Sequence, residues 1–133
     1  MAKAEGMRLP FSGVDQIQTS ILEDFPYEGP RQRIVYTTRE FSAVCPYSGL
    51  PDIADIKIEY VPNAKCVELK SLKYYFVSYR NVGIYQEPAT VRIYEDLWRL
   101  MQPLELTVSM TYNTRGGIDA TTSISSLEQP GKR

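Results

Sequence analysis

A cysteine in a proline-rich stretch is the residue of this sequence best suited to chemistry. Cys45 stands directly before a proline within residues 41–52, and Asp52 follows seven positions later. A thiolate is a strong nucleophile, and a thiol becomes reactive where cationic or dipolar surroundings lower its pKa and solvent can reach it. Two prolines and a glycine within six residues predict a rigid, irregular loop over 41–52. We therefore expect Cys45 to be accessible.

The chain contains no histidine, so a carboxyl group would have to manage protons in any such site. Imidazole is the usual general base near neutral pH and the commonest metal ligand. A carboxyl group replaces it only where burial or a like-charged neighbour raises its pKa, and Asp55 and Glu87 are candidate neighbours of Asp52. The alternative is that Cys45 is a small buried hydrophobe and Asp52 a turn residue.

The second cysteine adds no metal site. Cys66 lies just after a predicted strand, beside Val67, which favours a buried core position. A structural zinc needs four ligands at short paired spacings, and two separate cysteines cannot supply them. Nor do two cysteines form the dense framework typical of small secreted domains. The sequence therefore predicts no metal and a cytosolic redox environment.

Three further clusters have weaker signals, each open to two interpretations. Lys70 and Lys73 share one face of a predicted helix, where lysines either clamp phosphates or are simply solvated. Arg115, followed by two glycines, either presents its guanidinium to an anion or belongs to a tight turn. Gln86 and Glu87 open a predicted helix, where they either bind a planar, amide-like ligand or cap the helix.

Composition limits the chain to one domain and disfavours several classes of partner. The 133 residues include 15 Lys and Arg against 16 Asp and Glu, a net charge of −1. A chain of this length buries roughly two thirds of its unfolded surface, so one core suffices. Without a broad positive field, nucleic-acid binding is disfavoured. We expect a cytoplasmic protein, because no apolar run resembles a signal peptide or a membrane span.

Hydrophobic patterns predict six elements. Apolar and polar residues alternate, or β-branched residues cluster, in four predicted strands at 34–38, 54–60, 106–112 and 118–124. Apolar positions recur at three- and four-residue steps in two predicted helices, over 68–80 and from Glu87 to Pro103. The order strand-strand-helix-helix-strand-strand predicts an α+β fold, a four-stranded antiparallel sheet with two helices on one face.

The predicted domain has a segment on either side of it. Residues 1–30 read as a partly ordered arm with a short helical turn, residues 31–124 as the domain, and residues 125–133 as a flexible tail. A four-stranded sheet leaves two open edges, which are templates for other chains. We therefore expect a homo-oligomer.

Together these motifs resemble the 7-cyano-7-deazaguanine reductases, the QueF family. The matching segments are 41–52, 67–75, 79–81, 86–87 and 114–118, which span most of the domain. Cys-Pro-x-x-Gly-x-Pro-Asp followed by Glu-Leu-Lys-Ser-Leu-Lys, in this order and spacing, is highly specific. The family reduces a nitrile to an amine with NADPH to make the queuosine precursor. The resemblance implies the tunnelling fold, whose subunits close into barrels, commonly as decamers of two stacked pentamers.

The resemblance also implies roles for individual residues. Cys45 would add to the nitrile carbon and form a covalent thioimide, while Asp52 would shuttle the proton. The residues implied to bind the deazaguanine are Val67, Glu68, Leu69, Gln86 and Glu87. Those implied to hold the phosphates of NADPH are Lys70, Lys73 and Arg115. Sites in this family lie between subunits, so an isolated chain is expected to be inactive.

Gln86 departs from the family pattern, because the reductases usually carry His-Glu where this chain has Gln86-Glu87. That histidine is thought to help protonate the reduced nitrogen, and a glutamine amide cannot supply a proton. The neighbouring QueF-like amidinotransferases use the same thioimide but let ammonia attack it, which forms archaeosine on tRNA without NADPH. The retained cations and the lack of broad basic charge favour the reductase. The amidinotransferase and a non-catalytic deazapurine-binding protein are the alternatives.

Overall fold

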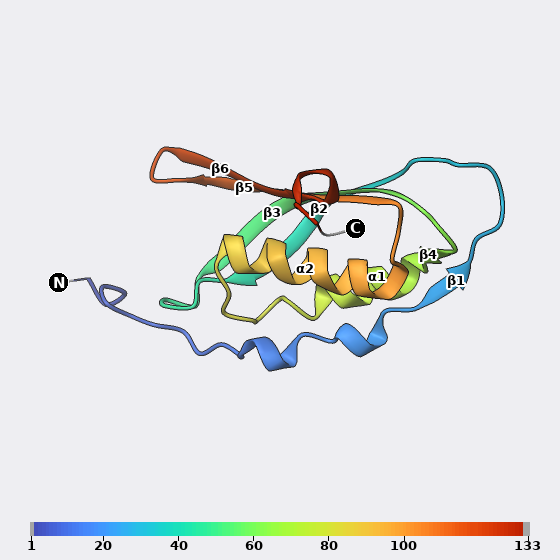
Figure 1. The fold of residues 1–133 in the computed structure, drawn as a ribbon. Helices are drawn as coiled ribbons and strands as arrows, with labels where there is room; N and C mark the ends of the chain where they lie inside the picture. Colours follow the sequence, from blue (N-terminus) through green and yellow to red (C-terminus); the bar gives the residue numbers. More distant parts are fainter. Residues whose placement is uncertain (1, 132–133) are drawn as a thin grey trace.

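The computed structural model describes residues 2–131 as two layers, a sheet with two helices on one face (Figure 1). The sheet is antiparallel, in the order β2-β3-β5-β6, and a two-stranded sheet pairs β1 with β4. The predicted α+β fold is confirmed. The strands are β1 (Asp24–Pro26), β2 (Ile34–Val44), β3 (Pro51–Val61), β4 (Lys65–Val67), β5 (Glu105–Arg115) and β6 (Ile118–Ser125), and the helices are α1 (Leu69–Val77) and α2 (Gln86–Met101).

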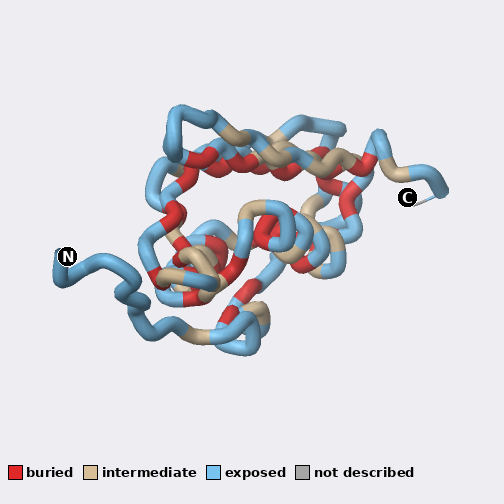
Figure 2. Tube along the Cα trace, turned by 90° about the vertical axis from the view of Figure 1, so that its left-hand side faces the viewer, coloured by how far each residue is buried: buried red, intermediate tan, exposed pale blue. Residues whose placement is uncertain are grey.

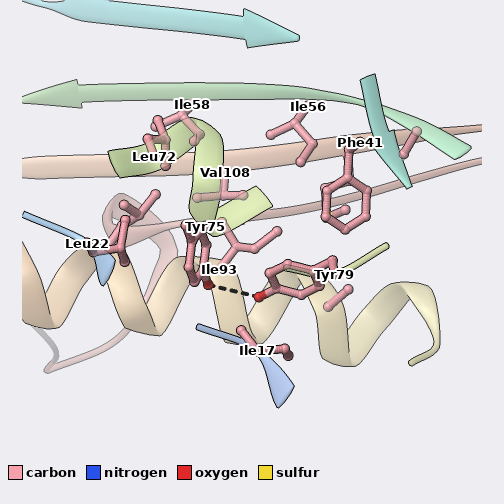
Figure 3. Packing of buried hydrophobic residues seen from close by; sticks show 14 of the residues in the cluster. Ile17, Leu22, Phe41, Ile56, Ile58, Leu72, Tyr75, Tyr79, Ile93 and Val108 are labelled. Atoms are coloured by element: carbon pink, nitrogen blue, oxygen red, sulfur yellow. Dashed lines mark hydrogen bonds between the residues drawn. The ribbon is translucent and has the colours of Figure 1, made fainter. Parts of the chain in front are cut away.

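The core lies between the sheet and the helices, because the two central strands, β3 and β5, bury every second side chain along most of their length. In β3 the even-numbered residues from 52 to 60 are buried and the residues between them are largely exposed. Buried segments line the side of the sheet that faces the helices (Figure 2). Phe41 of β2 packs on Tyr79, with ring centroids 5.1 Å apart (Figure 3). Removal of this apolar area from water holds the two layers together.

Local signals mark where both helices begin and where α2 ends. Glu68 caps α1, since its carboxylate accepts hydrogen bonds from the N–H groups of Lys70 at 3.1 Å and Ser71 at 2.7 Å. Pro88 lies in the first turn of α2, where its missing N–H costs nothing. Gln102 ends α2 in the left-handed conformation, with a φ of 45°. No helix within residues 2–131 has the length and apolar character needed to cross a membrane.

The hairpin near Cys45 differs from the prediction. The irregular loop expected over 41–52 is wrong: β2 continues through Val44 and β3 begins at Pro51, which leaves only residues 45–50 as loop. Proline is compatible with the first residue of a strand, where its missing N–H removes no ladder bond. The three-residue strands β1 and β4 were not predicted, because segments this short carry no measurable periodicity.

The two ends of the chain pack more closely than the sequence suggests. Residues after 125 form a 3₁₀ turn at Ser126–Glu128, and the buried Ser126 hydroxyl accepts a hydrogen bond from the Leu106 N–H at 3.0 Å. Met1 and residues 132–133 lie outside the described residues. The N-terminal arm runs along the helices (Figure 1) and contains two 3₁₀ turns, Val14–Gln16 and Thr19–Ile21.

A buried carboxylate fastens the arm to both helices. Asp96 of α2 is 4% exposed and accepts hydrogen bonds from the hydroxyls of Thr19 at 3.0 Å and Tyr75 at 2.7 Å, and from Arg92 Nε at 2.9 Å. Tyr75 in turn shares a hydrogen bond with Tyr79 (Figure 3). Because Asp96 is paired and hydrogen-bonded, its burial fixes the arm, α1 and α2 in one arrangement.

Candidate active site

Cys45 is the first residue of the tight loop that joins β2 to β3. The last cross-strand pair before it is Val44 with Pro51. Inside the loop, the Cys45 N–H donates to the Leu50 carbonyl at 2.9 Å, and the Cys45 carbonyl accepts from the Gly49 N–H at 2.9 Å. The Cys45 side chain is partly exposed. The loop therefore holds the sulfur on a fixed backbone that solvent and small molecules can reach.

Hydrogen-bond donors of the same loop lower the pKa of the Cys45 thiol. The largest contributions come from the backbone N–H and then the hydroxyl of Ser48, and the Tyr47 N–H and the charge of Arg115 act in the same direction. Partial burial opposes them but does not cancel them. Because these groups stabilise the thiolate, more of the nucleophilic form is present at neutral pH. Cys66, by contrast, is 3% exposed within β4, as predicted for a core residue.

Asp52 lies beside this loop and is paired with an arginine. It occupies the second position of β3, opposite Ala43, and is 6% exposed. Its Oδ1 forms an ion pair with Nη1 of Arg115, which lies at the end of β5. Asp55 is exposed on the opposite face of the sheet, so the expectation that it neighbours Asp52 is wrong. The buried carboxylate is instead neutralised by a cation that is itself half exposed.

The start of α2 lies at the same end of the sheet. Val44 hydrogen-bonds the segment before α2 on both sides: its N–H donates to the Val82 carbonyl at 3.0 Å, and its carbonyl accepts from the Ile84 N–H at 3.1 Å. Gln86 and Glu87 follow directly as the first residues of α2. Cys45, Asp52, Arg115, Gln86 and Glu87 are thus gathered at one end of the fold, although they come from four segments of the chain.

The environment of Glu87 includes a buried phenol that the sequence did not single out. Burial, and to a lesser extent the negative charge of Glu87, raise the pKa of Tyr112. Tyr112 is 4% exposed and pairs with Ala54 across the β5–β3 ladder. It therefore remains a neutral hydroxyl within the electrostatic reach of Glu87.

The other predicted substrate residues lie at the opposite end of the sheet. The Val67 N–H donates to the Tyr60 hydroxyl at 3.3 Å, and Tyr60 stands eight residues along β3 from Asp52. Eight strand residues span about 27 Å. Glu68 and Leu69 follow Val67 directly, so they lie far from Cys45 in the same chain (Figure 1). One chain therefore carries two groups of predicted site residues and does not bring them together.

A groove separates α1 from the edge strand β2. Its volume is about 550 Å³, and its walls include the apolar or aromatic residues Tyr36 and Phe76 and the cations Lys73 and Arg80. Lys70 is exposed in the first turn of α1. The predicted phosphate-binding residues are thus also divided, with the two lysines on α1 and Arg115 at the end of β5.

Three contributors to the Cys45 environment were not identified from the sequence. Ser48 supplies the groups that lower the pKa of the Cys45 thiol most, and Leu9 and Phe11 of the arm contact the loop and the segment beside it. Ser48-Gly49 carried a turn signal that was available in the sequence. Nothing in the arm indicates which segment it packs against.

Replacing Gly49 by alanine should destabilise the protein more than the same change at Gly117. Both glycines have a φ of +77°, but an added Cβ would lie 2.4 Å from the Leu9 carbonyl oxygen at Gly49 and would meet nothing within 4 Å at Gly117. Left-handed strain costs about 1–2 kcal/mol in either variant, and we expect Gly49→Ala to lose roughly 1–2 kcal/mol more because backbone must move. Urea unfolding of both variants measures this difference. Equal decreases in the free energy of unfolding would mean that the arm moves away from the added Cβ at no cost.

Known proteins with similar sequences identify the family. A family sequence model described as "QueF: QueF-like protein" matches residues 51–130. Two curated proteins, from Thermotoga petrophila and Thermotoga maritima, are each 57% identical over 129 residues, which is 96% of this chain and 94% of theirs. The chain belongs to the QueF family. Both relatives carry the name NADPH-dependent 7-cyano-7-deazaguanine reductase, as does a protein of Caldicellulosiruptor bescii that is 50% identical over 87% of this chain and 90% of its own.

A solved QueF-like structure has the same fold. The archaeosine synthase QueF-Like in its apo form aligns with a TM-score of 0.69 and covers 77% of this chain and 100% of that chain. The sequence identity is 23%, so the likeness concerns the fold alone. The predicted tunnelling fold is confirmed for this QueF chain.

Proposed function

We propose that this QueF protein reduces the nitrile of 7-cyano-7-deazaguanine to a primary amine with NADPH. The observation that carries the proposal is the 57% identity, over 96% of the chain, to proteins curated as that reductase. The accessible thiol of lowered pKa beside a buried carboxyl group supports the same chemistry. As a step of tRNA-modification biosynthesis on a small molecule, the reaction would take place in the cytoplasm.

Cys45 and Asp52 are the proposed catalytic residues. A nitrile is a weak electrophile, so attack by sulfur is accelerated when its nitrogen receives a proton at the same time. The Cys45 sulfur would form a bond to the nitrile carbon, and the proton would reach the nitrogen through Asp52 to give a thioimide. After the first reduction of that carbon the C–S bond would break, and Cys45 would leave as the thiolate that its loop stabilises.

The residues of this chain fit a dinucleotide cofactor in charge and in space. Each NADPH, when bound, would supply one hydride, so two NADPH molecules in turn would be needed to convert the nitrile into the amine. The groove beside α1 has largely apolar walls, two cations, Lys73 and Arg80, and one carboxylate, Glu40, so a net positive charge remains for a phosphate-bearing, partly aromatic ligand. We assign Lys70, Lys73 and Arg115 to the cofactor phosphates. Since Arg115 is paired with Asp52, this role would require Arg115 to exchange a carboxylate for a phosphate oxygen.

Recognition of the deazaguanine is assigned to both ends of the fold. Glu87 would accept hydrogen bonds from the donor edge of the base, with the Gln86 amide beside it, and Val67, Glu68 and Leu69 would contribute from the opposite end. About 27 Å of strand separates these ends within one chain. We therefore propose that a complete site is formed by two copies of the chain in a homo-oligomer, which the unpaired edges of β2 and β6 would allow.

The product made by purified wild-type protein tests the proposed function. With free 7-cyano-7-deazaguanine, we expect two NADPH to be oxidised per nitrile and the product to gain four hydrogen atoms. Intact-protein mass should show a covalent adduct without NADPH, and Cys45→Ala should lose it. Adduct formation without any NADPH oxidation would reject the reductase.

Gln86 gives one reason to test a second reaction in parallel. Its amide cannot donate a proton as an imidazolium would, and an amidinotransferase, in which ammonia attacks the thioimide, does not need that proton. A nitrile-bearing tRNA incubated with ammonium would then gain the mass of ammonia. An unchanged nucleoside mass excludes this reaction, and we expect that outcome because the chain lacks a broad basic charge.

A further inference from the structure

The N-terminal arm lies directly on the loop that carries Cys45. The Leu9 N–H donates to the Ser48 carbonyl at 2.7 Å, and the guanidinium of Arg8 sits 4.0 Å from the centre of the Tyr47 ring. The Leu9 carbonyl approaches Gly49 so closely that a Cβ there would lie 2.4 Å from its oxygen. Three consecutive loop residues therefore touch Arg8 or Leu9.

A second contact fixes the arm beside the base of the loop. A Cβ on Gly83 would lie 2.4 Å from two carbons of the Phe11 ring and 3.1 Å from the Pro46 Cα. The Phe11 ring and Pro46 therefore both lie against Gly83. Ser12 continues the contact through its backbone, donating to the Asn81 carbonyl at 2.7 Å and accepting from the Gly83 N–H at 2.9 Å. The segment around Gly83 is thus held between the arm on one side and Val44, the last residue of β2, on the other.

Two of the loop residues touched by the arm, Tyr47 and Ser48, are ones that stabilise the Cys45 thiolate. The N–H and hydroxyl of Ser48, and the N–H of Tyr47, lower the pKa of the Cys45 thiol. The backbone of a loop of four to six residues can adopt several conformations. Its N–H and O–H groups keep one orientation only where other contacts restrain that backbone. In this chain the hold comes from two sources, the Cys45–Leu50 and Gly49–Cys45 hydrogen bonds inside the loop and the arm outside it.

We propose that residues 8–12 are a positioning segment for the nucleophile, holding Tyr47 and Ser48 so that their donors converge on the Cys45 sulfur. This inference rests on the proposed function of Cys45 and adds a part of the chain that the reaction itself does not touch. This segment can restrain the loop because the arm is anchored further along the chain, where Ile17 and Leu22 are buried in the core. Thr19 is bonded to the buried Asp96.

The rate of Cys45 alkylation as a function of pH tests the proposal. Full-length protein is treated with iodoacetamide from about pH 5 to about pH 10, and Cys45 is followed by peptide mass, since only its thiolate reacts. In Phe11→Ala the midpoint of the rate profile should rise by about 0.5 to 1 on the pH scale, which lowers the rate at pH values below the midpoint about 3- to 10-fold. The plateau at high pH should stay the same, because every thiol is then ionised.

Two further variants keep the test decisive. Arg8→Ala removes an exposed contact to Tyr47 and cannot unfold the core, so it should raise the midpoint in the same direction by a smaller amount. Met7→Ala is the matched control, because this apolar arm residue is 58% exposed and its N–H donates to the Ala4 carbonyl within the arm. If Phe11→Ala and Arg8→Ala both keep the midpoint of Met7→Ala, the proposal is overturned. The assay uses neither nitrile nor NADPH, so an inactive wild-type enzyme would reject the proposed function and leave this result standing.

Discussion

Two variants that are each inactive should regain activity when they are combined in one assembly. Cys45→Ala removes the nucleophile at one end of the sheet, and Glu68→Gln changes a predicted substrate residue at the other. Strand geometry places these ends about 27 Å apart in one chain. If each site takes Cys45 from one copy and Glu68 from the next, a mixed oligomer contains sites in which both residues are intact.

The expected recovery can be calculated from random mixing. With equal amounts of both chains, a site has an intact Cys45 in half of the cases and an intact Glu68 in half of those, so about a quarter of wild-type activity should return. The two proteins are co-expressed so that mixed oligomers form, and NADPH oxidation is measured per site. Glu68→Gln keeps one of the two side-chain oxygens that cap α1, so this variant should still fold.

A second mixture serves as the control for complementation. Cys45 and Asp52 lie at the same end of one chain, so every site in a mixture of Cys45→Ala with Asp52→Ala lacks one of the two. That mixture should remain inactive. Should the Cys45→Ala and Glu68→Gln mixture also stay inactive, the proposal that Cys45 and Glu68 of different copies form one site would be wrong.

The central elements were predictable because their patterns are regular. Residues 54–60 alternate strictly and both helices carry apolar residues at helical spacing, so burial of one face determines their type. The hairpin bend was predicted too long because proline signals both a loop and the first residue of a strand. Pro51 has the second role, and local sequence does not distinguish the two.

The composition of the site was partly predictable, and its contacts were not. The sequence placed Cys45 and Asp52 on one stretch, which the structure keeps together across the hairpin. The ion pair between Asp52 and Arg115 joins residues 63 positions apart. It depends on the β3–β5 register and on an irregularity of the β5–β6 ladder between Tyr112 and Arg115, and both are tertiary features.

Asp52→Asn should abolish most of the covalent capture of the nitrile while leaving the thiol reactive. Asparagine keeps the size of the side chain but has no proton to transfer, and loss of a general acid slows such steps about 10²- to 10⁴-fold. We expect the rate of thioimide formation, followed by intact-protein mass without NADPH, to fall by this factor. Alkylation of Cys45 should change little, because its largest stabilising donors belong to Ser48 rather than to Asp52.

Asp55→Asn is the matched control, since it makes the same chemical change three residues along β3 on the exposed, opposite face of the sheet. Its adduct should form at the wild-type rate. Equal rates in both variants would remove Asp52 from the reaction and leave it a structural partner of Arg115. A slow adduct in Asp52→Asn together with normal alkylation shows instead that the carboxyl group acts on the nitrile and not on the sulfur, which is the division of roles that a thioimide mechanism requires.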